Sequence, residues 1–235
     1  MKFTVSEQVF EALPHVCFGI VVAKGIDNTK VYPEIEQRLQ QSIAEVEAKF
    51  EDVRAKQSEE IAPYRDAFQT LGFNPNKFMS SIEAMASRIE KKKGFPSINP
   101  AVDLGNAISL KYLVPMGAHN MEQAEEDICV RFAKADDTFV PFGLGQTEAE
   151  SPDDGELVYA VGDQIKTRRW IWRQSELGKI TSDSRHIFFP IDGFMGRNDA
   201  QVAGARAELA EWLQAQFGCA VLTGWVDRNN REMEL

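Results

Sequence analysis

The sequence predicts an α+β fold in which a mixed or antiparallel sheet packs with helices. Between residues 33 and 112, apolar side chains recur at helical spacing and are framed by helix-capping residues. After about residue 125, short runs of β-branched and aromatic residues alternate with Gly, Pro and Asp, which is typical of strands. A chain of 235 residues with 43% hydrophobic and 26% charged residues has an ordinary globular composition, so we expect one domain over residues 1–235.

Several classes of protein are excluded by the composition. No apolar run approaches the roughly 20 residues of a membrane-spanning helix, and polar residues interrupt the N-terminal stretch where a signal peptide would be continuously apolar. Cys17, Cys129 and Cys219 lie far apart, and the three histidines are not spaced as metal ligands. We therefore expect a cytoplasmic protein without a membrane partner, a metal or a cofactor.

The first elements follow from local patterns. Residues 15–23 predict a short buried strand, because β-branched and aromatic residues run together there. From Pro33 onward, apolar residues recur every three or four positions, which predicts an amphipathic helix of about 25 residues. A second helix is expected over residues 63–72, with Pro63 at its start and Gly72 as its left-handed cap.

Two further helices carry N-terminal capping signals. Ser80 and Glu83 have the spacing of a capping box, and the lysines at 91–93 follow where the end of a helix favours positive charge. The next helix begins with Asn99 as its N-cap and Pro100 at its first position.

A polar stripe runs along this last helix. Asp103, Asn106 and Ser109 stand at i, i+3 and i+6, and the helix ends in a Pro-Met-Gly-Ala turn at residues 115–118. Two interpretations are open. The stripe can be structural, with a helix-start charge and a buried hydrogen-bonding residue, or Asn106 can project into a cleft and hold a polar substrate atom.

Five apolar runs in the second half predict strands of a sheet. They are DICVRFA (127–133), FVPF (139–142), LVYAV (157–161), IKTRRWIW (165–172) and HIFFPI (186–191). Residues 143–156 predict a polar loop. Near the C-terminus, residues 199–217 predict a helix capped by Gly218, and residues 219–226 predict a strand.

One of these runs combines aromatic and basic residues. Strand alternation along IKTRRWIWR would place Arg168, Trp170 and Trp172 on one face. Two tryptophans in register would form a flat wall. That wall could belong to the core, or it could stack with an aromatic ring or a base, with arginine adding cation–π attraction.

The net charge of −10 is unevenly distributed. Residues 117–160 hold eleven acidic and two basic residues. In contrast, residues 61–116 hold seven basic and four acidic residues, and residues 161–190 hold six basic and three acidic residues. A nucleic acid could contact the two basic segments if they share a face. Otherwise the charges are ordinary solvated surface.

Six motifs in a fixed order carry a family resemblance. They are YRDAFQTLGFNP (64–75), SSIEAM (80–85), KGFPSINPAVDLGNAISLKYLVPMGAH (93–119), DICVRFA (127–133), ELVYA (156–160) and RRWIWR (168–173). In this order they resemble the editing domain of the phenylalanyl-tRNA synthetase β subunit, in the form that occurs as a separate small protein. The resemblance covers a core at about residues 60–190.

The resemblance implies an α+β domain whose cleft holds the aminoacyl end of a tRNA and hydrolyses a wrongly attached amino acid, which is tyrosine in the synthetase. Asn106 matches an asparagine of that cleft. Gly105 stands where the family has threonine, and Gly117 stands where it has the histidine of a Pro-Met-His-Ala turn, with His119 two residues later. Asp192 is the carboxylate near the position that reads the tyrosine hydroxyl in the family.

We therefore expect a freestanding editing-like domain that binds aminoacyl-tRNA and hydrolyses mischarged tRNA, with its catalytic residues unassigned. The expected substrate-binding residues are Gly105, Asn106, Gly117, Ala118, Trp170, Trp172 and Arg173, and the expected tRNA-binding residues are Lys91, Lys92, Lys93, Arg168 and Arg169. A non-catalytic module that binds free amino acid, another small molecule or uncharged tRNA is an alternative, because Gly105 and Gly117 remove side chains from the cleft. A structural domain with a vestigial cleft is a third.

Overall fold

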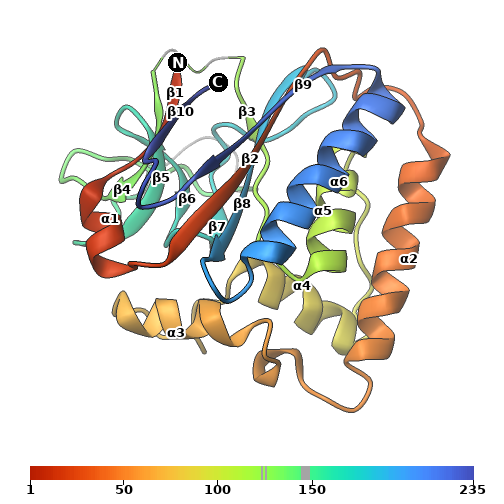
Figure 1. Ribbon diagram of the computed structural model, residues 1–235, viewed down its shortest axis with the longest axis horizontal. Helices are drawn as coiled ribbons and strands as arrows, with labels where there is room; N and C mark the ends of the chain where they lie inside the picture. Colours follow the sequence, from red (N-terminus) through yellow and green to blue (C-terminus); the bar gives the residue numbers. More distant parts are fainter. Residues whose placement is uncertain (123, 125, 144–148) are drawn as a thin grey trace.

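The computed structural model describes residues 1–122, 124, 126–143 and 149–235. It confirms the predicted α+β class: two sheets lie on one side of the molecule and most of the helices lie on the other (Figure 1). Residues 144–148 of the predicted polar loop lie outside the described part.

The helices are α1 (Glu7–Ala12), α2 (Pro33–Lys49), α3 (Ala62–Thr70), α4 (Ser81–Glu90), α5 (Pro100–Tyr112) and α6 (Asp199–Phe217), with a short 3₁₀ turn, η1 (Ala55–Gln57). The strands are β1 (Lys2–Val5), β2 (Val16–Lys24), β3 (His119–Asn120), β4 (Ile128–Phe132), β5 (Leu157–Val161), β6 (Gln164–Arg168), β7 (Arg173–Gln174), β8 (His186–Phe194), β9 (Ala220–Val226) and β10 (Glu232–Glu234).

The described strands form two sheets. The six-stranded sheet has the order β10-β1-β4-β5-β6-β7 and is mixed, because β1 runs parallel to β4 while its other pairs are antiparallel. The four-stranded sheet has the order β3-β8-β2-β9 and is antiparallel throughout. The sequence predicts a mixed or antiparallel sheet, and the structure contains one mixed sheet and one antiparallel sheet. The two ends of the chain lie side by side, since Lys2 pairs with Glu234 (Figure 1).

The main core lies where the two sheets face each other. The Phe3 ring of β1 lies 5.6 Å from the Phe18 ring of β2 and 5.2 Å from the Phe188 ring of β8, measured between ring centres. The predicted strand at residues 15–23 is confirmed as β2, which is buried at every position except its last. Burial on both faces explains why its sequence is continuously apolar rather than alternating.

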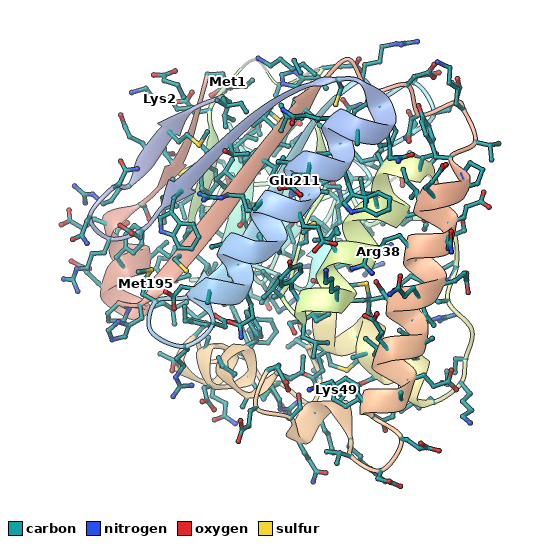
Figure 2. All side chains as sticks on the ribbon, turned by 45° about the vertical axis from the view of Figure 1, so that its right-hand side comes forward. Met1, Lys2, Arg38, Lys49, Met195 and Glu211 are labelled. Atoms are coloured by element: carbon teal, nitrogen blue, oxygen red, sulfur yellow. The ribbon has the colours of Figure 1, made fainter. Side chains whose placement is uncertain are left out.

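Helices cover the four-stranded sheet on its other side. α6 packs on β2 and β8, α5 lies beside α6, and α2 forms the outer layer against α5 (Figure 1). Arg38 of α2 lies between the helices (Figure 2), and its guanidinium donates to the Glu208 carboxylate of α6 at 3.1 Å. Among the described residues, none of the helices has the length and apolar character needed to cross a bilayer.

The predicted helix caps are confirmed. The Ser80 hydroxyl accepts a hydrogen bond from the Glu83 amide at 3.3 Å, and the Asn99 side chain accepts one from the Val102 amide at 3.1 Å. Gly218 ends α6 with a left-handed φ of 62°. These caps satisfy backbone groups that a helix end leaves without partners, so they fix where α4, α5 and α6 begin or end.

Two predicted elements differ from the structure. α2 ends at Lys49 rather than after about 25 residues, because Glu51 and Asp52 follow directly and the negative end of the helix dipole disfavours acidic side chains. Val53, which the spacing places on the apolar face, is 50% exposed. The run FVPF (139–142) makes isolated bridges instead of a strand, and its proline lacks the amide that a ladder requires.

Candidate functional site

Two adjoining hollows border the segment that leads from α5 to β3. The first, which we call the aromatic hollow, has a volume of about 150 Å³ and is lined by Ser81, Pro115, Met116, Gly117, His119, Tyr159, Thr167, Trp170, Ile171, Trp172, Gln174, Pro190 and Asp192. The second, the Asn106 hollow, has a volume of about 140 Å³ and is lined by Ile98, Val102, Gly105, Asn106, Met116, Gly117, Ala118, Phe142, Gln174, Lys179 and Ile180. Met116, Gly117 and Gln174 border both.

The described residues also form larger depressions. A depression of about 610 Å³ at the end of α2 is larger, but its charged lining residues, such as Glu47, Asp52 and Lys92, are exposed. Within the described part of the chain, no group of three or more His, Cys, Asp or Glu side chains could hold a metal ion.

Asp192 on β8 forms the polar centre of the aromatic hollow. Its Oδ1 accepts hydrogen bonds from the Tyr159 hydroxyl and the Trp170 indole N–H, each at 2.7 Å. Tyr159 lies on β5, so this carboxylate ties the two sheets together. Its Oδ2 accepts no hydrogen bond from the described residues, and Asp192 lines the hollow.

The environment of Asp192 shifts its titration. Burial raises the pKa of the carboxyl, hydrogen bonds from Tyr159 and Trp170 lower it, and the outcome is a pKa of about 7 against an ordinary 3.8. Burial and the neighbouring Asp192 raise the pKa of Tyr159 well above its usual value. Asp192 therefore titrates near neutral pH, while the Tyr159 hydroxyl keeps its proton and remains a donor.

His119 lines the same hollow from β3. Its ring stacks on Tyr159 with 5.8 Å between ring centres, and burial lowers the pKa of the imidazole to about 4, so it is neutral at pH 7. Its Nδ1 is buried without a hydrogen-bond partner. A Cβ at Gly117 would lie 3.0 Å from His119 Nε2. The imidazole therefore fills the space beside Gly117, which is where the resemblance leads one to expect a histidine.

The segment after β6 is a strained turn rather than the continuation of a strand. Arg169 and Trp170 have φ values of 44° and 60°, and such a left-handed conformation costs a non-glycine residue about 1–3 kcal/mol. The fully buried Glu156 carboxylate holds the turn by accepting from the Arg169 amide at 2.9 Å and from the Arg168 guanidinium at 2.7 Å. The prediction that residues 165–172 form one strand with Arg168, Trp170 and Trp172 on one face is therefore wrong.

Arg168 and Arg169 are engaged inside the protein. They are 7% and 5% exposed. Arg168 pairs with Glu156 at 2.7 Å and with Glu150 at 3.0 Å, and Arg169 pairs with Asp153. The expectation that these two arginines contact tRNA phosphates is corrected accordingly, because buried guanidinium groups with carboxylate partners are not presented to a ligand.

The two tryptophans line the aromatic hollow at different depths. Trp170 is fully buried and Trp172 is half-buried, so they do not form the flat wall that strand alternation predicts. The Arg169 guanidinium carbon lies 3.9 Å from the centre of the Phe78 ring and 4.6 Å from that of Trp172, which fixes Trp172 by cation–π contact. Arg173 lies 6.0 Å from the Trp172 ring and lines neither hollow.

The polar stripe of α5 divides into structural and site-facing residues. Asp103 is buried and accepts from the Ile98 amide at 2.8 Å, and the Ser109 hydroxyl donates to the Val114 carbonyl at 2.6 Å. Asn106 is half-buried, lines the Asn106 hollow, and makes no side-chain hydrogen bond to the described residues. Gly105, Gly117 and Ala118 line this same hollow, so the structure gathers these three predicted residues beside Asn106. Gly117 also borders the aromatic hollow with the tryptophans, whereas Gly105, Asn106 and Ala118 do not.

The lysines at 91–93 are exposed at the C-terminal end of α4. Ser81, at the other end of this helix, lines the aromatic hollow. Ten residues at 1.5 Å each separate the lysines from the hollow by about 15 Å. The Lys92 ammonium lies 3.7 Å from the Glu47 carboxylate, but the Lys92 side chain remains largely exposed. The lysines thus lie outside the hollow, on the surface of the same helix.

Sequence reasoning missed Tyr159, Met116 and Gln174. Tyr159 lies in an apolar run, and a tyrosine in such a run indicates that its hydroxyl will need a hydrogen-bond partner once it is buried. Gln174 carries no comparable signal, because its amide donates to the Ala118 carbonyl, which lies 56 positions away in the chain.

Comparisons with known proteins show which family the chain matches and which solved structures it resembles. The profile described as the B3/4 domain matches residues 63–213. No curated protein matches the chain. An N-terminal fragment of the phenylalanyl-tRNA synthetase β-subunit from Pyrococcus horikoshii is similar in structure, with a TM-score of 0.48 and 10% identity; the similarity covers 94% of this chain and 53% of that one. The chain thus spans about half the length of that fragment.

Proposed function

The chain belongs to the B3/4 domain family, which confirms the resemblance drawn from its motifs, and on that premise we propose that it binds the aminoacyl end of a tRNA and hydrolyses mischarged aminoacyl-tRNA. The observation that carries the proposal is the aromatic hollow, where a buried carboxylate and a neutral imidazole line one cavity of about 150 Å³. Perturbed titratable groups that converge in a cavity are typical of functional sites.

The aromatic hollow would receive the side chain of the amino acid. A cavity of about 150 Å³ has the size that accommodates a benzene ring. Trp170, Trp172 and Tyr159 supply aromatic surface for such a ring. The Oδ2 of Asp192 would accept a hydrogen bond from a hydroxyl or another donor on it.

The Asn106 hollow would receive the polar part of the ligand. The Asn106 side chain makes no hydrogen bond to the residues that the structure describes and would orient the aminoacyl group, while Gly105, Gly117 and Ala118 leave space for it. Arg173 would lie at the rim, outside both hollows.

Hydrolysis would use water as the nucleophile. A water attacks the ester carbonyl, its proton passes to a base, and the ribose oxygen of the tRNA leaves with a proton. His119 lines the aromatic hollow and is neutral at pH 7, so this imidazole would hold the water or accept its proton. Backbone groups and the neighbouring ribose hydroxyl would help to position the water, and no protein nucleophile is required.

The phosphates of the tRNA would contact the lysines at 91–93. These side chains are exposed, and they follow the helix whose first residue lines the aromatic hollow. Phosphate contacts would orient the tRNA, whereas the hollows would select the amino acid.

The test is release of amino acid from a panel of mischarged tRNAs, measured at low salt because phosphate binding weakens steeply as salt rises. His119→Ala and Asp192→Asn should each lower the rate for the preferred substrate, while Gln69→Ala, at an exposed position on α3, should not. Absence of release by the wild-type chain with every tRNA of the panel rules the activity out.

A second candidate is a non-catalytic module that binds free amino acid, another small molecule or uncharged tRNA. It is favoured by the packing of His119 against Gly117, because an imidazole that fills a gap need not act as a base. A ligand at a hundred times its dissociation constant stabilises a protein by about 2.7 kcal/mol, so a rise in melting temperature with amino acids detects it. Stabilisation without hydrolysis supports this candidate, and hydrolysis without stabilisation excludes it.

A further inference from the structure

Three of the described residues border both the aromatic hollow and the Asn106 hollow, and we call them the wall between the two. Met116, Gly117 and Gln174 border both cavities, whose volumes are about 150 Å³ and about 140 Å³. Each cavity alone has the size of one small ring. Removing part of this wall would therefore join two small spaces into one larger space.

Two of the wall residues are held by main-chain pairing. The Gly117 amide donates to the Pro190 carbonyl at 3.0 Å, and Met116 forms an antiparallel bridge with Ile191. This part of the wall is thus an extension of the four-stranded sheet. A side chain at Gly117 cannot thicken it without displacing His119, whose Nε2 would lie 3.0 Å from the new Cβ.

Gln174 is the side chain that completes the wall. It lies on β7, opposite Thr167 of β6. Its amide nitrogen donates to the Ala118 carbonyl at 2.6 Å, so the side chain reaches from the six-stranded sheet to the segment that pairs with the four-stranded sheet. Because this contact is made by a side chain, a substitution can open the wall while the main-chain pairing of both sheets stays in place.

We propose that Gln174 determines the size of the side chain that the aromatic hollow accepts. With its amide on Ala118, the hollow admits a side chain with one ring and excludes one with two fused rings. Without it, the second ring occupies the space that the Gln174 side chain leaves, while the aminoacyl group keeps its place beside Asn106. The inference rests on the proposed function, because it takes the occupant to be the side chain of an amino acid, either free or attached to tRNA.

The test compares phenylalanine with tryptophan, both as free amino acids by calorimetry and as charged tRNAs by release rate. The wild-type chain is expected to favour phenylalanine by about tenfold or more, a margin that pocket size can supply. Gln174→Ala abolishes or reverses this ratio. Gln174→Met, which keeps the bulk of the wall, retains it. Gln69→Ala, at an exposed glutamine on α3, is the matched control and behaves as the wild type.

The outcomes separate the inference from the proposed function. A folded Gln174→Ala variant with the wild-type ratio overturns the inference and leaves the proposed function intact, as does a wild-type chain that treats both amino acids alike. A wild-type chain that neither binds nor releases phenylalanine or tryptophan overturns the inference, and absence of release across the whole panel of mischarged tRNAs overturns the proposed function as well. Thermal melting verifies folding, and Gln174→Asn, one methylene shorter, replaces the alanine variant if that variant is unfolded.

Discussion

The indole nitrogen of Trp170 donates a hydrogen bond of 2.7 Å to the same Asp192 oxygen that the Tyr159 hydroxyl contacts. This contact joins the strained turn after β6 to the long strand β8 of the other sheet. One buried carboxylate therefore organises both the packing of the sheets and the polar centre of the aromatic hollow. Stability and ligand binding should respond together when it is changed.

Asp192→Asn should remove a pH dependence of stability. The folded pKa of Asp192 is about 7 against an ordinary 3.8, so the folded state binds more protons than the unfolded state between these values. The free energy of unfolding contributed by this group is therefore fully present below about pH 4 and is lost as pH rises to about 7, by at most about 1.4 kcal/mol per pH unit. Urea unfolding of both proteins across this range measures it. A constant difference between them would contradict the shift.

Trp170→Phe should destabilise the protein more at pH 8 than at pH 4. It keeps most of the aromatic surface but removes the N–H that favours the ionised form of Asp192, which should lower the free energy of unfolding by about 2 kcal/mol at the higher pH. Trp225→Phe is the matched control, because its indole donates to the Asp227 carboxylate at 3.2 Å from a half-buried position. The control should cost less than about 1 kcal/mol. Equal losses in the two variants would count against a special role for Trp170.

Glu156→Gln should be among the most destabilising single changes. Glu156 is fully buried and holds Arg168 and the Arg169 amide, so the variant leaves a buried guanidinium without its counter-charge and should lower the free energy of unfolding by about 3–5 kcal/mol. Glu150→Gln removes a 3.0 Å contact with the same Arg168 from a side chain that is 47% exposed. That control should cost less than about 1 kcal/mol in the same denaturant titration.

Gly117→Ala and Gly105→Ala should have opposite effects. A Cβ at Gly117 would meet His119 Nε2 at 3.0 Å and Pro190 Cγ at 3.2 Å, so overpacking should cost about 1–3 kcal/mol. A Cβ at Gly105 meets atoms at ordinary distances of 3.7 Å, and alanine inside α5 should gain up to about 1 kcal/mol. In a double-mutant cycle, adding His119→Ala to Gly117→Ala should restore part of the lost free energy of unfolding. Strictly additive effects of the two substitutions would contradict the close packing of these two residues.

Replacing Lys91, Lys92 and Lys93 by alanine should weaken tRNA binding and flatten its salt dependence, because fewer counterions are released. Binding of free amino acid should stay unchanged, since the lysines lie about 15 Å from the aromatic hollow along α4. Lys30→Ala, at another exposed lysine, is the control. An unchanged salt slope in the triple variant would place the phosphate contacts elsewhere.

Local signals in the sequence were sufficient for the helix ends. Ser80, Asn99 and Gly218 cap α4, α5 and α6 as predicted, because a cap depends on a few neighbouring backbone groups and on a permissive φ. The α+β class was likewise readable from the change in periodicity, and the order of the motifs pointed to the family whose profile matches residues 63–213. In each of these features, the interactions that decide the outcome lie close together along the chain.

The site was only partly predictable from the sequence, because many of its contacts join residues that are far apart in the chain. Asn106, Gly105, Gly117 and Ala118 share a hollow as a local helix and its exit turn suggest. The turn at Arg169 and Trp170 was not predictable, because the carboxylate that holds it, Glu156, lies 13 positions earlier in the chain, just before the neighbouring strand β5.

The sequence by itself determined the caps of α4, α5 and α6 and the position of strands such as β2, since capping and periodicity act over a few residues. Only the tertiary structure decided which side chains face a cavity. Arg168 became an internal ion-pair partner, Asp192 became a carboxyl that titrates near neutral pH, and Gln174 became a wall between two hollows. Arg168 is buried against Glu156, 12 positions earlier in the chain, whereas the contacts of Asp192 and Gln174 arise only when the two sheets pack together.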